Sequence, residues 1–410
     1  MKIGIIGGSG VYTPILVNEI TMLNDYLNLD LIVLNGRSVE KLNAVKTVCE
    51  YIVKKSGQDI KIHTTDNRIE AISGMDVIIC QIRVGGLEAR AFDEEFPRKF
   101  GIVGEETVGP GGLSNAMRTI PVMLQITAEV EQYNKKANLI VLTNPCGMVL
   151  RAINYRHKVN ATGLCDMPQN LINSIASFLH TKPEKIFAEY YGLNHFGWIN
   201  KVYHKGVDVT RTVIDNFENI DVNIDKEIVR IHGAVPISYL KYYFHPERFL
   251  EGSKPVKARE LISLEGEILR NIQSGDIEEV LNLLNRRSVK WYRYIVEYIK
   301  ALNDDNWSYH ILNVRNGSTL DFLPENSVIE VGCLVKRGVA KPLPVRDIPQ
   351  SVKAMIFQMD TYEDLAVKGI LNNDYDTLME ALMIHPHIRS YDKAKLVLES
   401  ILEGNRKMGF

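Results

Sequence analysis

Residues 2–14 read Lys-Ile-Gly-Ile-Ile-Gly-Gly-Ser-Gly-Val-Tyr-Thr-Pro, and this stretch decides the fold. The β-branched run Lys2–Ile6 predicts a buried parallel strand, and a helical pattern begins at Ile15. The glycine-rich turn between them would let the backbone approach a pyrophosphate, while the helix N-terminus supplies positive potential. A plain tight turn is the alternative. If the turn binds a dinucleotide, its contacts come from Gly7, Gly8, Ser9, Gly10, Val11 and Tyr12.

The second predicted strand, Leu29–Leu34, ends in Asn35-Gly36-Arg37. An acidic residue at this point would hold the ribose 2′-hydroxyl of NAD. The Asn35 amide is able to bond the same hydroxyl, whereas Arg37 leaves room for the 2′-phosphate of NADP. The choice between the two cofactors therefore stays open at this point.

Strand and helix patterns continue to alternate along the chain, which favours a parallel sheet. An almost wholly apolar strand at residues 76–82 ends at Arg83 and two glycines, at the carboxyl strand end where such sheets bind ligands. After residue 195 the alternation becomes irregular. We therefore predict an α/β fold with a Rossmann-like domain over residues 1–165 and an α+β domain over residues 166–410.

Two polar segments of the first domain are candidates for a ligand site. Residues 87–112 are polar and glycine-rich and are too long for a simple connection, so they predict a functional loop that contains Arg90 and Glu106. The strand Asn138–Leu142 leads to Asn144, which precedes a proline. The Asn144 amide either caps the next helix or points at a ligand.

The residues with the most distinctive chemistry are Cys165, Asp166 and His195. They belong to Gly-Leu-Cys-Asp-Met-Pro and Gly-Leu-Asn-His-Phe-Gly-Trp, which both follow apolar runs, as strand ends that deliver side chains into a cleft do. A thiolate and an imidazole are able to share a soft or borderline metal, and the carboxyl beside them is a proton donor or acceptor. The alternative is a buried structural cysteine and a core histidine, because two ligands are too few for a closed structural site. A metal that also binds substrate would leave such open positions.

The segment beyond these residues carries weaker signals. An antiparallel pair is predicted for Trp198–His204 and Val207–Arg211. Tyr239 and the tyrosines three and four residues later share one face of a predicted helix, a stripe that is usually core. Arg259 precedes a long helix and could bind an anion, although a surface cation is the commoner explanation.

The composition is that of an ordinary globular protein, with 45% hydrophobic and 24% charged residues in a chain of 410. The net charge of −2 arises from well-mixed signs, which argues against a basic surface for nucleic acid or an anionic membrane. No run approaches the roughly 18 apolar residues of a spanning helix, and the first residues lack the pattern of a secretory signal. Five cysteines without close pairing fit a reducing compartment. We therefore expect a cytoplasmic protein without a nucleic-acid or membrane partner.

Taken in order, these motifs resemble glycoside hydrolase family 4, the NAD- and metal-dependent glycosidases of the lactate/malate dehydrogenase-like superfamily. The resemblance is greatest to the 6-phospho-glycosidases. It implies an enzyme that hydrolyses a phosphorylated disaccharide or glucoside with NAD and a divalent metal, usually manganese, and we expect a homodimer or homotetramer. The motifs are the turn with Tyr12-Thr13-Pro14, Arg83 before Gly-Gly, Arg90-x-x-Asp93-Glu94, Gly104-x-Glu106-Thr107, Asn144-Pro145, Cys165-Asp166-x-Pro168, Gly192-Leu-Asn-His195, Tyr239-Leu-x-Tyr-Tyr and Arg259.

The resemblance also implies roles for single residues. Family 4 is an exception to the two-carboxylate mechanism of most glycosidases. NAD would oxidise C3 of the sugar and so acidify the C2 proton, while a metal on Cys165 and His195 would polarise the sugar oxygens. Tyr239 would remove the C2 proton, with Glu106 raising its basicity, because a phenol of ordinary pKa (about 10) is a poor base at neutral pH. Asp166 would protonate the leaving oxygen during elimination, before water adds at C1 and the hydride returns.

Binding roles follow in the same way. Arg83 would belong to the NAD site, together with the turn, Asn35 and Arg37. Arginine suits the oxygens of a phosphate, so arginines dominate the implied contacts to the sugar and its phosphate. These substrate contacts are Arg90, Asn144, Asn194 and Arg259.

The linkage is inferred from one residue. In the family, Cys-Asp at this point accompanies α-linked substrates and Cys-Asn accompanies β-linked ones, so Asp166 favours a 6-phospho-α-glucosidase. A 6-phospho-β-glucosidase is the alternative. A relative acting on unphosphorylated or uronic glycosides would lack phosphate contacts at Arg259. A 2-hydroxyacid dehydrogenase would release net NADH, and a non-catalytic NAD sensor would not need the Cys-Asp, His and Tyr set.

Three positions depart from the family pattern. The turn has Gly-Gly-Ser-Gly in place of three consecutive glycines, and Asn35 replaces the usual acid. Cys146 follows Asn-Pro where the family has a small Ala or Ser, which would place a second thiol near the site.

Overall fold

The glycine-rich turn follows the first strand of a nine-stranded sheet in the computed structural model, which describes residues 1–250, 255–286 and 291–410. The strand order is β13-β12-β11-β6-β5-β4-β1-β2-β3, and the six strands from β6 to β3 are parallel. Their order is that of dinucleotide-binding sheets, so the predicted Rossmann-like architecture is confirmed. These strands are β1 (Lys2–Ile6), β2 (Leu31–Asn35), β3 (Lys61–Thr65), β4 (Val77–Cys80), β5 (Asn138–Val141) and β6 (Asn160–Gly163).

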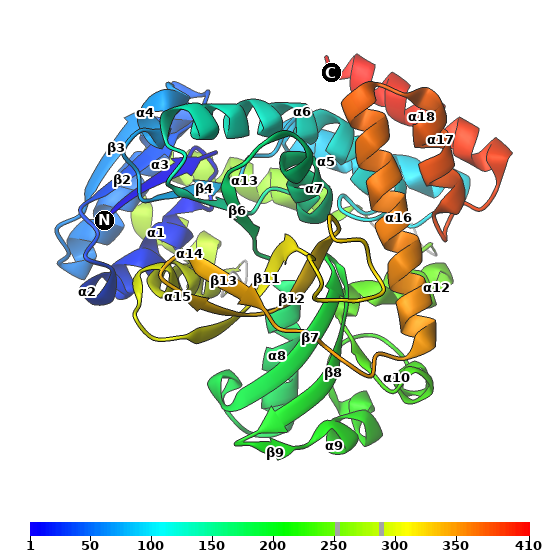
Figure 1. Cartoon of the computed structure of the whole chain (residues 1–410). Coiled ribbons are helices and arrows are strands. Elements are labelled where there is room, and N and C mark those ends of the chain that lie inside the picture. The colour runs from blue at the N-terminus through cyan, green and yellow to red at the C-terminus, as the bar shows by residue number, and fades with distance from the viewer. Residues whose placement is uncertain (251–254, 287–290) are drawn as a thin grey trace.

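Helices cover both faces of the parallel strands (Figure 1), which is why these strands are apolar almost throughout. The longer helices have clear end signals. In α3 the Ser38 hydroxyl accepts a hydrogen bond from the Lys41 amide, and Gly57 ends the helix at φ +72°. The helices of this part are α1 (Thr13–Met22), α2 (Asn24–Leu27), α3 (Val39–Ser56), α4 (Arg68–Ile72), α5 (Gly86–Glu95), η1 (Phe96–Phe100), α6 (Gly109–Tyr133) and α7 (Cys146–Arg156).

The prediction of one long loop over residues 87–112 was wrong. Helix α5 and the 3₁₀ turn η1 occupy its first half, and α6 begins at Gly109. The glycines there serve close packing, since a Cβ on Gly111 would lie 2.1 Å from the Glu105 carbonyl oxygen and 2.5 Å from that of Asp93. Polar side chains suggested a solvent-exposed loop, but in α5 several of them are buried in ion pairs.

The second half of the chain contributes an antiparallel hairpin that projects away from the large sheet (Figure 1, bottom). The predicted pairing over residues 198–211 is only partly right, because β8 pairs mainly with the preceding β7 and the later strand is short. A helix, α9, begins at Thr210 instead. The strands of this smaller sheet are β7 (Ile186–Leu193), β8 (Phe196–His204), β9 (Val207–Asp208) and β10 (Val235–Pro236).

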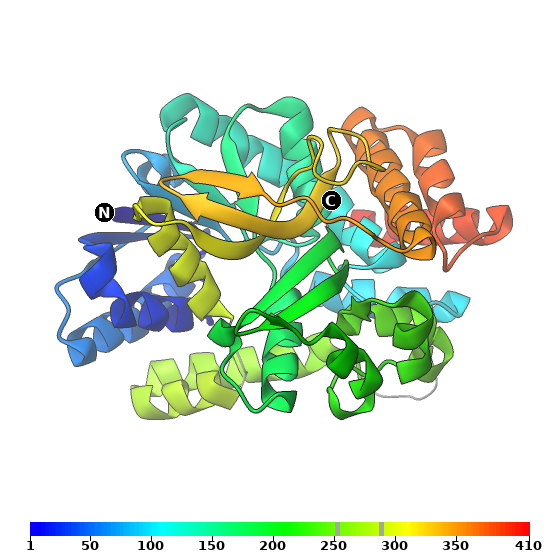
Figure 2. The same cartoon turned by 60° about the horizontal axis from the view of Figure 1, so that its bottom comes forward.

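Three later strands join the large sheet at its β6 edge and connect the two halves of the chain. They are antiparallel, and Asn313 of β11 pairs with Gly163 of β6. Figure 2 shows these strands crossing from the N-terminal part toward α16. The division into residues 1–165 and 166–410 stays a prediction, and the two parts share one sheet. The added strands are β11 (Ser308–Arg315), β12 (Val328–Lys336) and β13 (Val339–Pro342).

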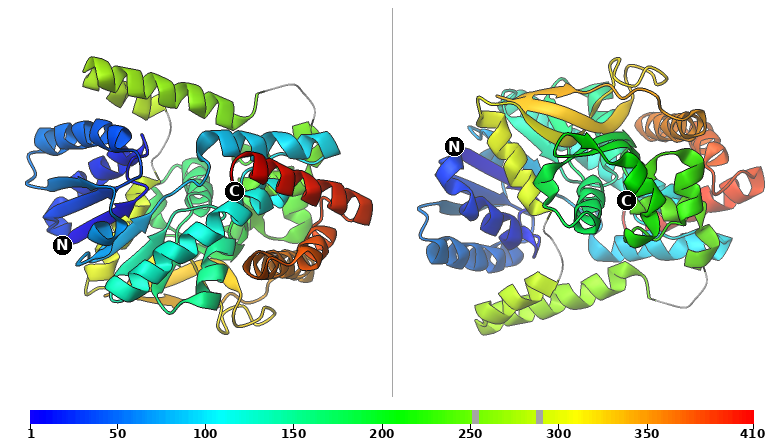
Figure 3. Two further views of the ribbon diagram at one scale, coloured as in Figure 1. Left: turned by 90° about the horizontal axis from the view of Figure 1, so that it is seen from above. Right: turned by 90° about the horizontal axis from the view of Figure 1, so that it is seen from below.

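The remaining helices surround the hairpin and the outer side of the nucleotide half. Helices α13 and α14 run beside α3 (Figure 3) and share a small apolar cluster with it. The predicted tyrosine stripe does not lie on one helix, since Tyr239 belongs to the 3₁₀ turn η4 and the next two tyrosines to α11. Among the described residues, no helix combines the length and the apolar character needed to cross a membrane. The helices are α8 (Met167–Phe178), η2 (Pro183–Lys185), α9 (Thr210–Asp215), η3 (Phe217–Asn219), α10 (Lys226–His232), η4 (Ser238–Leu240), α11 (Lys241–Phe244), α12 (Pro246–Leu250), α13 (Lys257–Ser274), α14 (Ile277–Arg286), α15 (Tyr292–Asn303), α16 (Gln350–Asn372), α17 (Tyr375–Ile384) and α18 (Tyr391–Lys407).

A buried arginine fastens the C-terminal helices to the nucleotide half. Arg151 of α7 is only 1% exposed and pairs with Asp360 of α16, and its guanidinium lies 3.9 Å from Glu363 and 3.5 Å from Asp364. Asp360 also accepts a hydrogen bond from Ser327, which precedes β12. Removing the cation would leave buried carboxylates without a counter-charge.

We expect Arg151→Met to lower the free energy of unfolding by about 3–5 kcal/mol, the range found when one partner of a buried ion pair is removed. Denaturant titration followed by circular dichroism measures this change. The control is Lys55→Met, which removes the exposed pair with Glu278 and should leave stability unchanged within error. Equal losses in the two variants would contradict a special contribution from the buried pair.

Candidate active site

A cavity of about 710 Å³ lies where β1, β4 and β5 end, the edge at which open parallel sheets bind ligands. Most of the residues singled out in the sequence meet here, although they come from both halves of the chain. The predicted residues that line it are Gly7, Gly10, Val11, Tyr12, Arg83, Arg90, Glu106, Asn144, Asp166, His195 and Tyr239.

The glycine-rich turn forms one wall of the cavity. Gly7 has φ +87°, and a Cβ there would lie 3.0 Å from the backbone of Gln81, so only glycine suits the position. The Gln81 amide donates to the Thr13 hydroxyl (2.8 Å), which holds the start of α1 against the end of β4. Gly8 and Ser9 are not among the lining residues, and Ser9 packs against Gly36.

The two residues predicted to recognise the ribose lie outside the cavity lining. Asn35 is buried, and its side-chain amide donates to the Thr65 carbonyl (3.1 Å) instead. Its own carbonyl accepts from the amides of Gly7 (3.1 Å) and Gly8 (2.7 Å), so Asn35 supports the turn from behind. Arg37 is exposed at the end of β2.

His195, Tyr239 and Asp166 form a compact group at the opposite wall. His195 occupies the two-residue turn between β7 and β8 with φ +60° and is 5% exposed. The Tyr239 ring stacks on it, with centroids 4.5 Å apart and an interplanar angle of 16°. Burial lowers the pKa of His195 to about 4, against the opposing charge of Asp166. The imidazole is therefore neutral at pH 7, which is the form that binds a metal.

The nitrogen and sulfur atoms of His195 and Cys165 are suited to bind a metal ion. The Nδ1 atom of His195 is buried and has no hydrogen-bond partner among the described residues, a costly state that a bound cation would relieve. The Cys165 sulfur lies 3.7 Å from the Asp166 carboxylate. Burial, followed by the charge of Glu330, raises the pKa of the Cys165 thiol well above its usual range, so it would need a cation to become a thiolate.

The metal would keep open positions. In the part of the chain that the structure describes, no three His, Cys, Asp or Glu side chains gather into a metal-binding cluster. Cys165 and His195 would thus supply two ligands and leave the others to substrate or water, as catalytic sites require.

The carboxylate beside Tyr239 is Glu105, and the prediction of Glu106 in this role was wrong. The Tyr239 hydroxyl donates to Glu105 (3.2 Å), which also accepts from the amide and hydroxyl of Thr107. Burial, then the charge of Glu105, raises the pKa of Tyr239 well above its usual range. Glu106 instead pairs with Arg83 and, at 2.7 Å, with Arg90. Adjacent glutamates on an irregular segment point in different directions, and the sequence does not reveal which one faces the tyrosine.

Comparison with known proteins identifies the family. A sequence model described as "Family 4 glycosyl hydrolase" matches residues 2–181, and one described as "Family 4 glycosyl hydrolase C-terminal domain" matches residues 190–388. The chain belongs to glycosyl hydrolase family 4. The family expected from the sequence motifs is therefore confirmed.

Solved structures support the same assignment. The 6-phospho-beta-glucosidase of Thermotoga maritima with manganese, NAD⁺ and glucose-6-phosphate is 30% identical and has a TM-score of 0.92 over 100% of this chain and 99% of that one. A 6-phospho-alpha-glucosidase from gut microorganisms in complex with NAD and glucose-6-phosphate is 28% identical, with a TM-score of 0.91 over 100% and 98%. Lactate dehydrogenase from Eimeria maxima is 14% identical with a TM-score of 0.59 over 91% and 96%, a likeness of fold alone.

Two of the four predicted substrate residues of this family 4 chain do not line the cavity. Arg259 is exposed and pairs with Glu88 (2.8 Å) and Glu95 (2.9 Å) of α5. The Asn194 amide turns away and donates to Glu330 (3.2 Å). Arg90 and Asn144 remain at the cavity, so the guanidiniums nearest the candidate catalytic residues belong to Arg83 and Arg90.

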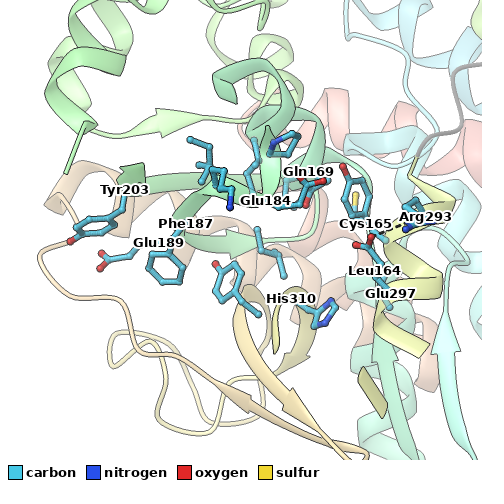
Figure 4. A pocket seen from close by; sticks show the side chains of 18 of the residues that line it. Leu164, Cys165, Gln169, Glu184, Phe187, Glu189, Tyr203, Arg293, Glu297 and His310 are labelled. Atoms are coloured by element: carbon cyan, nitrogen blue, oxygen red, sulfur yellow. Dashed lines mark hydrogen bonds and ion pairs between the residues drawn. The ribbon is translucent and has the colours of Figure 1, made fainter. Parts of the chain in front are cut away.

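A second cavity, of about 1210 Å³, lies on the other side of the segment that carries the candidate metal ligand. Figure 4 shows Cys165 at one end of it, near Arg293 and Glu297, and Phe187 with Tyr203 toward the other. Asp166 and Met167 line the first cavity, whereas Leu164, Cys165 and Pro168 line the second. The segment 164–168 thus separates the two spaces.

Besides Glu105, which accepts from Tyr239, sequence reasoning missed several residues that line the cavity. Met167 and Trp291 are apolar and gave no signal of function, and Gln81 was treated only as part of a strand. Lys41 pairs with Glu265 (2.6 Å) across the nucleotide side of the cavity. Such a pair between α3 and α13 depends on tertiary placement, so the sequence contained no local sign of it.

If Cys165 is a metal ligand of this family 4 site, Cys165→Ser should weaken Mn²⁺ binding by more than about 100-fold, beyond the 10- to 100-fold typical of an outer-shell partner. Titration of the purified protein with Mn²⁺, followed by electron paramagnetic resonance of the free ion, measures the affinity. The matched control is Cys49→Ala, which removes a buried thiol of α3 and should bind Mn²⁺ as the parent does. Unchanged affinity in a folded Cys165→Ser protein would exclude this ligand.

Proposed function

We propose that this chain hydrolyses 6-phospho-glucosides in an NAD- and divalent-metal-dependent reaction, and that the linkage it cleaves is α. The observation that carries the proposal is that Asp166, His195 and Tyr239 share one cleft with a dinucleotide-type turn, and that the Cys165 sulfur lies behind this wall, 3.7 Å from the Asp166 carboxylate. A simple 2-hydroxyacid dehydrogenase would have no need of a base stacked on a metal-binding imidazole. The relatives bound to NAD, manganese and glucose-6-phosphate support the same reaction class.

When bound, NAD would accept and return a hydride at C3, and a divalent cation would polarise the sugar oxygens. The rest of the chemistry belongs to side chains of this chain. Tyr239 would take the proton from C2, which the adjacent ketone has acidified. Its own proton has an acceptor in Glu105, since the hydroxyl already donates to that carboxylate. A raised pKa makes the phenolate a stronger base once it forms, so burial beside Glu105 suits this role.

Asp166 would protonate the leaving oxygen. It precedes α8, is half-buried in the cleft, and accepts a hydrogen bond from Asn170 (3.3 Å) on its second oxygen. An axial leaving oxygen would lie on the metal side of the ring, within reach of an acid next to Cys165. This is the reason for preferring α over β linkage, with a 6-phospho-β-glucosidase as the alternative.

The phosphate would be recognised by Arg90 together with Arg83, which the family motifs had placed in the NAD site, because both guanidiniums converge on Glu106 at the cavity. One carboxylate holding two arginines positions both for a dianionic ligand, which offers more oxygens than Glu106 does. All five cysteines are free thiols, which supports a reducing compartment such as the cytoplasm. Assembly as a homodimer or homotetramer stays a prediction.

If C3 oxidation precedes elimination, turnover should need only catalytic NAD, release no net NADH and introduce solvent deuterium at C2 of the product. Tyr239→Phe should retain NAD binding and lose the exchange by about 100-fold or more, the usual contribution of a positioned base. Mass spectrometry or NMR of the sugar measures it. The control Tyr242→Phe, whose ring contacts Tyr239 edge-on outside the cavity lining, should exchange normally. A product without deuterium from the parent enzyme would point to direct displacement at C1.

If Asp166 is the general acid, Asp166→Asn should lose about 10²–10⁴-fold in kcat/KM on α-linked 6-phospho-disaccharides, because an amide cannot donate a full proton. The loss should shrink to a few-fold on nitrophenyl 6-phospho-α-glucosides, whose leaving group needs little protonation. Steady-state assays with matched α and β substrates provide the comparison. A parent enzyme that cleaves only β-linked substrates would refute the α assignment and leave the redox mechanism intact.

A further inference from the structure

Glu330 of β12 is a fully buried carboxylate outside the active-site cavity. Its oxygens accept hydrogen bonds from the Tyr190 hydroxyl (2.7 Å) and from the amides of Asn194 (3.2 Å) and Asn313 (2.7 Å). All three donors are neutral. Burial raises the pKa of Glu330 to about 7 although these bonds oppose the rise. A carboxylate held in the core by neutral donors is costly, and an apolar side chain would suit the strand better.

One of the three bonds holds the turn that carries His195, and a second reaches Tyr190 on β7 of the same hairpin, away from that turn. Leu193 pairs with Phe196, so Asn194 and His195 alone form the turn between β7 and β8. Tyr190 lies further along β7 of the same hairpin, and β7 runs beside β12 (Figure 1). His195 has φ +60°, a conformation rare for a side-chain-bearing residue, so the direction of its ring depends on how firmly the turn is held. The bond to Asn194 acts directly on that turn.

The third bond reaches β11, which is paired with β6, the strand that ends two residues before Cys165. Asn313 of β11 pairs with Gly163 of β6, and Cys165 follows two residues later. The strands are so close here that a Cβ on Gly163 would lie 3.0 Å from the Asn313 Cβ and 2.3 Å from the Cys146 sulfur. The same carboxylate oxygen of Glu330 that accepts from Asn194 accepts from Asn313. One atom thus links the turn that carries His195 to β11, the strand that pairs with the end of β6 just before Cys165.

We propose that Glu330 is a positioning residue that fixes Cys165 and His195 relative to each other and so sets the affinity of the site for its divalent cation. The inference rests on the proposed metal-dependent function and adds a residue that touches neither metal nor substrate. Outer partners that orient metal ligands typically change metal affinity 10- to 100-fold when they are removed. A cost in folding free energy at Glu330 is consistent with such a role, because functional groups are retained where an apolar residue would be more stable.

The test compares three variants by Mn²⁺ titration of the purified protein, with the free ion followed by electron paramagnetic resonance. Glu330→Leu removes every acceptor at similar size and should weaken Mn²⁺ binding about 10- to 100-fold. Glu330→Gln should remain within a few-fold of the parent, because its oxygen is able to face both amides while its NH₂ faces the Tyr190 hydroxyl. Tyr190→Phe is the matched control, since it removes a bond to Glu330 and leaves both amide bonds in place. It should bind Mn²⁺ as the parent does.

Thermal unfolding and NAD titration of each variant separate positioning from general destabilisation. NAD affinity should stay within about two-fold throughout, because no residue of this network belongs to the cavity lining that contains the turn at Gly7. Parent-like Mn²⁺ affinity in a folded Glu330→Leu protein would overturn the inference. A loss of Mn²⁺ affinity that parallels the loss of melting temperature in every variant would also overturn it. If Glu330→Leu does not fold, Asn313→Ala removes only the hydrogen bond between Glu330 and β11. This variant should still weaken Mn²⁺ binding. A parent protein that binds no Mn²⁺ would instead refute the proposed metal dependence itself.

Discussion

The close contact between Gly163 of β6 and Asn313 of β11 is the constraint on which the rest of the site depends. It permits no side chain at position 163, and it attaches three antiparallel strands to the edge of a parallel nucleotide-binding sheet. The hairpin of β7 and β8 contacts the middle one of those strands, β12. The cofactor turn and the candidate metal ligands, although far apart in sequence, are therefore held in one continuous framework. Catalytic groups need such a framework, because small displacements of reacting atoms are costly.

Burial controls the protonation of this cleft. It makes His195 neutral and raises the pKa of both the Cys165 thiol and the Tyr239 phenol. Among the described residues that line the cavity, the cationic side chains pair with carboxylates, Arg83 and Arg90 with Glu106 and Lys41 with Glu265. A bound divalent ion would lower the pKa of the Cys165 thiol and that of the Tyr239 phenol. The electrostatics of the site therefore agree with the proposed metal dependence.

The fold by itself does not determine the reaction. Lactate dehydrogenase shares the architecture at 14% identity, yet its likeness extends no further than the fold. What distinguishes the family 4 chain is the hairpin turn with His195 and the Tyr239 turn. Both lie beyond the parallel strands in the sequence and line the cavity at the end of the nucleotide-binding sheet. A Rossmann-type sheet accommodates this change because its ligands bind at the carboxyl ends of strands, where loops and added elements vary without disturbing the core.

The sequence alone predicted the strand–turn–helix start and the alternation that gives a parallel sheet, because glycine spacing and apolar runs are local signals. It also singled out Cys165, Asp166 and His195, whose roles stay predictions. It did not determine that residues 87–100 are helical, since their buried ion pairs look like solvent-exposed polarity until their partners are known. It identified a glutamate beside Tyr239 but chose Glu106 where the structure has Glu105. Glu330 could not be found from sequence, because it lies in an ordinary-looking strand and all of its bonds reach residues at least 17 positions away. Contacts of that kind depend on how strands pair across the whole chain, and only the tertiary structure decides them.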